Sequence, residues 1–161
     1  MSAEGDDRPE TTDDGDDPGL ELQAPPVVFP GQTGPESAYR VAHDLLVRRA
    51  AREALDVVEP ALEQDPSSYG LRSLRAWAFL IRVQLERAEA ELVDLVEENP
   101  ADVWVRHALG RALERQSRLR DALPHLRLAA AMSGDPEHEV AVLRVERRLA
   151  ETGETSYDDL V

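Results

Sequence analysis

Polar and apolar positions from residue 35 to residue 151 follow a helical pattern. Ala, Leu, Arg and Glu dominate this region, glycine is rare, and no stretch alternates apolar and polar residues as a half-buried β-strand does. Asp135-Pro136-Glu137 has the composition of a helix start, and Thr33 and Glu36 have the spacing of a capping box around Pro35. The pattern therefore predicts an all-α protein.

The helical region repeats itself at intervals of 34 residues. Several independent positions coincide in this register, which chance seldom produces, so the chain contains an internal repeat. The coinciding sets are Ala42, Ala76 and Gly110; Leu45, Phe79 and Leu113; Ala54, Ala88 and Ala122; Val58, Leu92 and Leu126; Ala61, Leu95 and Ala129; and Asp65-Pro66 with Asn99-Pro100.

The residue types that recur indicate the structure of one unit. Small residues such as Ala76 and Ala88 let two helices cross closely, and larger ones such as Leu92 fill the space between them. The Asn99-Pro100 pair ends the second helix, because a residue before proline is pushed out of the helical region. Each unit is thus predicted to be two antiparallel helices that bury their apolar faces by stacking on the next unit.

These motifs resemble the tetratricopeptide repeat (TPR) family. The matching residues are Ala76, Phe79, Ala88 and Pro100 in the second unit, and Leu109-Gly110, Leu113 and Ala122 in the third. The resemblance implies a right-handed α-solenoid of three antiparallel helix pairs, at about residues 35–68, 69–102 and 103–134. Residues 136–151 would form a C-terminal capping helix.

Several positions depart from the family pattern. The glycine usual in the turn within each unit is replaced by Arg49, Val83 and Ser117, so we expect those turns to have a different shape. Pro60 lies within a predicted helix, where it should kink the helix or remove one hydrogen bond. Arginines also stand at positions that are usually apolar in the family, namely 72, 75 and 106.

In the family, the first helix of each unit lines a concave surface, and the resemblance implies the same for this chain. The candidate partner-binding residues on that surface are Tyr39, His43, Trp77, Trp104, His107, Arg111 and Arg115. Large aromatics and arginine dominate the residues that contribute most to protein binding. Trp77 stands in the apolar run 76–81, so an equally good interpretation makes it a core residue.

Arg111 and Arg115 are one helical turn apart, so together they could hold a carboxylate. The adjacent Glu114 favours the alternative that these three side chains form a solvated surface network.

Composition restricts the function. The net charge is −15, all 18 basic residues are arginine, and cysteine is absent. This charge argues against binding to nucleic acids or anionic membranes. Neither a signal peptide nor a membrane-spanning run is recognisable, so we expect a cytoplasmic protein. The use of arginine without lysine is typical of proteins from high-GC bacteria. The four histidines lack metal-site spacing and no nucleotide-binding or hydrolase motif occurs, so no metal, cofactor or enzymatic activity is predicted.

Both ends of the chain are acidic. Residues 1–34 carry nine acidic side chains and one arginine, and are predicted to be disordered, as are residues 152–161. Within the first tail, the apolar segment Pro26-Val27-Val28-Phe29-Pro30 is either a plain linker or an extended segment that docks on the folded domain or on a partner. Either tail could compete weakly with an acidic ligand near Arg111, or serve solubility alone.

The sequence therefore predicts a non-enzymatic adaptor or scaffold that binds a protein or peptide in the concave groove. The alternative is a structural repeat protein that self-associates and has no separate ligand. We expect a monomer or a weak homo-oligomer. A nucleic-acid mimic, which would rest on the acidic charge alone, is the third hypothesis.

Overall fold

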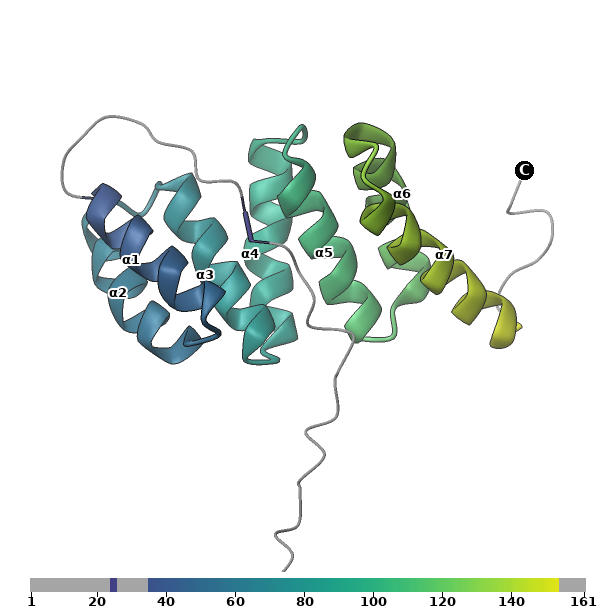
Figure 1. The fold of residues 1–161 in the computed structure, drawn as a ribbon, viewed down its shortest axis with the longest axis horizontal. Helices are drawn as coiled ribbons and strands as arrows, with labels where there is room; N and C mark the ends of the chain where they lie inside the picture. The colour runs from purple at the N-terminus through teal and green to yellow at the C-terminus, as the bar shows by residue number, and fades with distance from the viewer. Residues whose placement is uncertain (1–23, 26–34, 154–161) are drawn as a thin grey trace, which may run out of the picture.

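The computed structural model describes residues 24–25 and 35–153, and all regular structure within them is helical. The described residues form seven α-helices, which follow one another along the chain (Figure 1). They are α1 (Pro35–Val47), α2 (Ala51–Gln64), α3 (Tyr69–Ile81), α4 (Leu85–Glu98), α5 (Val103–Arg115), α6 (Leu119–Ser133) and α7 (Pro136–Glu151). The predicted all-α architecture is confirmed.

The helices recur with the predicted period. Helices α1, α3 and α5 begin at residues 35, 69 and 103, and helices α2, α4 and α6 begin at 51, 85 and 119, so that both series advance by 34 residues. Each helix packs on its neighbour in sequence, and α1 also contacts α3, as α3 does α5. The result is a row of helix pairs ending in α7 (Figure 1).

The recurring small residues lie where helices cross. Ala42, Ala76 and Ala88 are fully buried. At the position equivalent to Ala42 and Ala76, Gly110 of α5 lies so close to Leu126 of α6 that an added Cβ would be 2.7 Å from its side chain. The small residues therefore set the spacing between helices, as the sequence predicted.

The predicted helix ends are also found. Helices α2 and α4 stop immediately before Asp65 and Asn99, the residues that precede the prolines. The carboxylate of Asp135 accepts a hydrogen bond from the backbone N–H of Glu137 at 2.9 Å and so caps α7. Side-chain caps and prolines together fix where the chain changes direction.

The expectation that the turns within the three units would have an altered shape, because they lack glycine, is wrong. Arg49, Val83 and Ser117 have φ angles of 61°, 57° and 60°, the left-handed conformation that glycine adopts most easily. In all three turns the following residue donates a backbone hydrogen bond five residues back, for example Gln84 N to Phe79 O at 2.9 Å. This is the Schellman arrangement, so the hydrogen bonds of the helix end override the cost of a side chain there.

Pro60 lies inside α2, which continues without a break from Ala51 to Gln64. Pro124 stands in the same way inside α6, a feature that the sequence analysis did not single out. Since proline has no N–H, each helix lacks one backbone hydrogen bond at that point.

Some predictions lie outside the described residues: the capping-box contact of Thr33 and Glu36, the disorder of the N-terminal tail except at Ala24–Pro25, the segment 26–30, and the C-terminal end after Gly153. Among the described helices, none is long and apolar enough to cross a bilayer.

Candidate functional site

Four aromatic rings from α1, α3 and α5 form a row across three units. The rings of Tyr39 and His43 are stacked with centroids 6.1 Å apart, His43 meets Trp77 edge-on at 5.9 Å, and Trp77 meets Trp104 edge-on at 6.4 Å. We call the surface made by Tyr39, His43, Trp77 and Trp104 the aromatic face. The structure thus brings together four of the seven candidate residues.

The repeat itself explains this row. His43 and Trp77 occupy equivalent positions 34 residues apart, so stacking one unit on the next places their rings side by side. Tyr39 and His43 are one helical turn apart and therefore share a face of α1. Gly70, at the start of α3, leaves room for the Tyr39 ring, since a Cβ on Gly70 would lie 3.0 Å from it.

Burial divides the members of the aromatic face. Trp77 is 5% exposed and Trp104 9% exposed, so both tryptophans belong largely to the core, and the core interpretation of Trp77 applies. Tyr39 and His43 are only partly buried. Burial, with a smaller contribution from the charge of Asp102, raises the pKa of Tyr39, so its hydroxyl stays neutral and can donate a hydrogen bond.

A short segment before the helices lies on this face. Nε2 of His43 is 3.3 Å from the carbonyl oxygen of Pro25, and because a carbonyl can only accept, Nε2 carries the proton. Pro25 is buried, and Ala24 is partly buried against the core. In Figure 1 this two-residue segment, drawn in purple, lies in front of the helix row.

His107 lies at the contact between α5 and the last helix, α7. Its ring stacks on His138 of α7 with the centroids 4.2 Å apart, and its Nδ1 has no hydrogen-bond partner among the described residues. Burial, helped by the nearby His138 and Arg111, lowers the pKa of His107 to about 3. The ring is therefore neutral at physiological pH and serves as a packing group between α5 and α7.

Arg111 does not belong to a surface network as the sequence analysis favoured. Arg111 and Glu114 are both buried, and they form an ion pair at 3.0 Å. Arg144 of α7 donates two hydrogen bonds to the Glu114 carboxylate at 2.7 and 3.0 Å, and Arg148 lies 3.7 Å away. The α7 arginines lie about 30 residues further along the chain, which is why the local spacing of α5 did not reveal them.

Arg115 has a different environment from Arg111. Its Nη1 donates to the carbonyl oxygen of Leu80, near the C-terminal end of α3, at 2.9 Å. A cation is favoured there because unsatisfied carbonyls gather at the end of a helix. Arg111 and Arg115 thus have separate protein partners: Arg111 pairs with Glu114 within α5, and Arg115 joins α5 to α3.

A second polar link that the sequence analysis missed joins the N-terminal ends of α3 and α5. The hydroxyl of Tyr69, the first residue of α3, donates to the carboxylate of Asp102 at 3.0 Å. Asp102 also caps α5 by accepting from Val105 N at 3.0 Å. Burial and the Asp102 charge raise the pKa of Tyr69, so this hydrogen bond persists over the whole physiological range.

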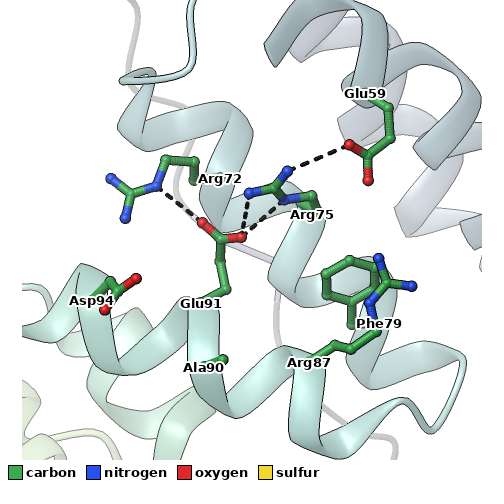
Figure 2. A pocket seen from close by; sticks show the side chains of 8 residues that line it. All are labelled: Glu59, Arg72, Arg75, Phe79, Arg87, Ala90, Glu91 and Asp94. Carbon is green, nitrogen blue, oxygen red and sulfur yellow. Dashed lines mark hydrogen bonds and ion pairs between the residues drawn. The ribbon is translucent and has the colours of Figure 1, made fainter. Parts of the chain in front are cut away.

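A hollow of about 470 Å³ between α2, α3 and α4 contains none of the candidate residues. In Figure 2, Arg72 and Arg75 converge on the Glu91 carboxylate, and Arg75 also reaches Glu59. The arginines at positions expected to be apolar therefore replace an apolar contact with ion pairs between helices. Three arginines line this hollow (Arg72, Arg75 and Arg87) and so do three acidic residues (Glu59, Glu91 and Asp94), so it lacks a net positive charge that would attract an anion.

Among the described residues, no group of three or more histidine or acidic side chains is arranged to hold a metal ion.

The comparisons with known proteins identify the fold. No protein-family model and no curated protein matches the chain. Among solved structures, the TPR domain of Arabidopsis OM64 is similar with a TM-score of 0.65 and 18% identity, over 70% of this chain and 94% of that one. MamA of MSR-1 is similar with a TM-score of 0.64 and 18% identity, over 76% and 71% of the two chains. MamA of AMB-1 gives 0.62 and 17%, over 75% and 67%.

The protein is therefore an α-helical repeat domain. More narrowly, its fold is that of a TPR domain, with three helix pairs and one further helix in the part of the chain that the structure describes. Identities this low define the fold and not the partner.

Proposed function

We propose that this protein is a non-enzymatic adaptor or scaffold that binds a protein or peptide segment across the aromatic face. The observation that carries the proposal is the continuous row of rings over α1, α3 and α5. Aromatic rings offer a large contact area at a small entropic cost, and Tyr39 and His43 remain partly accessible at one end of the row. The TPR fold itself supports a role in protein interaction.

The two arginines among the candidate residues support recognition by the rings and not by charge. Arg111 is paired with Glu114 within α5, and Arg115 donates to a carbonyl near the end of α3, so both charges already have partners inside the protein. The ligand would accordingly be recognised by packing and hydrogen bonds at Tyr39 and His43. With a net charge of −15, the chain favours neutral or basic partners, and we expect it to act in the cytoplasm.

An affinity capture that compares two matched histidine variants tests the proposal. His43→Ala removes a partly buried ring from the aromatic face, whereas His125→Ala removes a ring of similar burial from the outer helix α6. Proteins retained by the wild type and by His125→Ala, but lost from His43→Ala, would be ligands of the aromatic face. If both variants retain the same proteins as the wild type, the assignment of this face is wrong.

Self-association is the second candidate function, and the last helices favour it. Leu128 and Met132 of α6 and Val140 and Leu143 of α7 are large apolar residues that are exposed at the end of the helix row. Such residues can pack against a second copy. Light scattering over a range of protein concentrations decides: a mass that stays at one chain excludes self-association as the function.

A further inference from the structure

The segment Ala24–Pro25 lies where a ligand of the aromatic face would lie. The Pro25 carbonyl accepts a hydrogen bond from His43 Nε2 at 3.3 Å, although the two residues are 18 positions apart in the chain. Pro25 is buried and Ala24 packs against the core. The contact therefore combines a polar anchor on an accessible ring with burial of a proline.

The local sequence prepares this segment for such a contact. Ala24 and Pro25 each precede a proline, which disfavours the helical region for both and favours an extended backbone. An extended proline-bearing segment loses little conformational entropy on binding and exposes its carbonyl groups, and aromatic-lined surfaces in other proteins bind such segments. The aromatic face supplies the matching features: flat rings for the proline, and the His43 N–H for a carbonyl.

We infer that the aromatic face is a binding site for an extended proline-containing peptide, and that the chain's own Ala24–Pro25 segment occupies it intramolecularly. The inference rests on the proposed function and names both the ligand class and a competitor that is built into the chain. Only nine residues, 26–34, separate Pro25 from the start of α1. A tether of this length can span roughly 30 Å and gives an effective concentration in the millimolar range. An external ligand must displace the tethered segment, so its apparent affinity equals its intrinsic affinity multiplied by the fraction of molecules whose site is free.

A peptide titration on the full chain tests the inference. The probe is a synthetic peptide with the sequence of residues 20–30, LELQAPPVVFP, labelled for fluorescence anisotropy. Pro25→Asp places a charge at the buried proline and should release the segment. Pro9→Asp makes the same chemical change elsewhere in the tail and is the matched control. We expect Pro25→Asp to bind the peptide about tenfold more tightly than the wild type or Pro9→Asp.

Intrinsic fluorescence gives an independent readout, because both tryptophans of the chain, Trp77 and Trp104, lie on the aromatic face. Release of the segment in Pro25→Asp should shift their emission to longer wavelength, and saturating peptide should reverse the shift. Far-UV circular dichroism verifies the helices, and Ala24→Asp serves as the second variant if Pro25→Asp loses helical signal. Equal peptide affinity in all variants, or no binding to any of them, overturns the inference.

Two results separate this inference from the proposed function. If the peptide never binds but His43→Ala loses partners in the affinity capture, the face is a binding site and the intramolecular occupant is wrong. If the peptide binds Pro25→Asp but the capture finds no His43-dependent partner, the face serves only the chain's own segment. A wild type that is dimeric while Pro25→Asp is monomeric would place the segment on a second copy, which also overturns the intramolecular assignment.

Discussion

Because Val83 has a left-handed backbone conformation, we predict that a substitution by glycine reduces stability less there than at an ordinary helical position. Val83 has a φ of 57°, where its branched Cβ is crowded by the backbone. The left-handed conformation costs roughly 1–2 kcal/mol for a residue with a Cβ, and glycine removes that cost. Val83→Gly therefore relieves strain that the wild type carries.

Two effects of the same substitution lower the free energy of unfolding and must be separated from this gain. Glycine makes the unfolded chain more flexible, at a cost of about 0.5–1 kcal/mol, and it removes the contacts of the valine side chain. Val140→Gly in α7 suffers the same two losses, because Val140 is 57% exposed and Val83 is 58% exposed. The two variants differ mainly in the backbone conformation, so we expect Val83→Gly to be more stable than Val140→Gly by about 1–2 kcal/mol.

Urea unfolding followed by circular dichroism measures both free energies of unfolding, with the slope of the transition as a check that the two proteins unfold alike. Relative to the wild type, we expect Val83→Gly to be unchanged or more stable by up to about 1 kcal/mol, and Val140→Gly to be less stable by about 1 kcal/mol. If the two variants lose stability equally, the left-handed turn is not strained and the reasoning fails.

Three further predictions concern the helix contacts. Gly110→Ala should reduce the free energy of unfolding by about 1–3 kcal/mol in a urea titration, because its Cβ would meet Leu126 at 2.7 Å; a neutral result would mean that α5 and α6 can separate easily. Glu114→Gln should cost about 3–5 kcal/mol, since it leaves the buried Arg111 without a counter-charge. Glu146→Gln, which disturbs a more exposed pair with Arg127, should cost less than about 1 kcal/mol, and similar losses in the two variants would refute the importance of burial. His107 has a pKa of about 3 in the fold and about 6.5 when unfolded, so the unfolded chain binds the proton first and stability falls as the pH decreases from 6.5 toward 3. Between pH 6.5 and pH 5, the wild type should lose about 1–2 kcal/mol more than His107→Gln in thermal or urea unfolding, and parallel pH profiles would show that His107 does not titrate in this way.

Periodic small residues and proline pairs were sufficient to predict the helix pairs. Ala42 and Ala76 are small because neighbouring helices cross there. Asp65-Pro66 ends a helix because proline disfavours the helical conformation of the residue before it. The turn at Val83 was not predicted, because glycine is preferred in the left-handed region but is not required when the helix-end hydrogen bonds form.

The sequence predicted which candidate side chains lie near one another, but not how far each of them is exposed to solvent. The repeat register places His43 and Trp77 on one face, and the structure brings their rings together. How much of Trp77 remains accessible depends on the neighbouring helices, which spacing within α3 cannot express. The burial of Glu114 likewise depends on Arg144 of α7, and a pairing over 30 positions leaves no periodic signal in the sequence.

The seam between α5 and α7 determines how far the chain can be shortened. A design that ended after the third helix pair would keep every repeated position, yet it would strip Glu114 of Arg144 and would uncover the ring of His107. We therefore expect the smallest autonomous fragment to extend through α7, which buries Ala141, Val145 and Leu149 against the array and supplies Arg144 to Glu114.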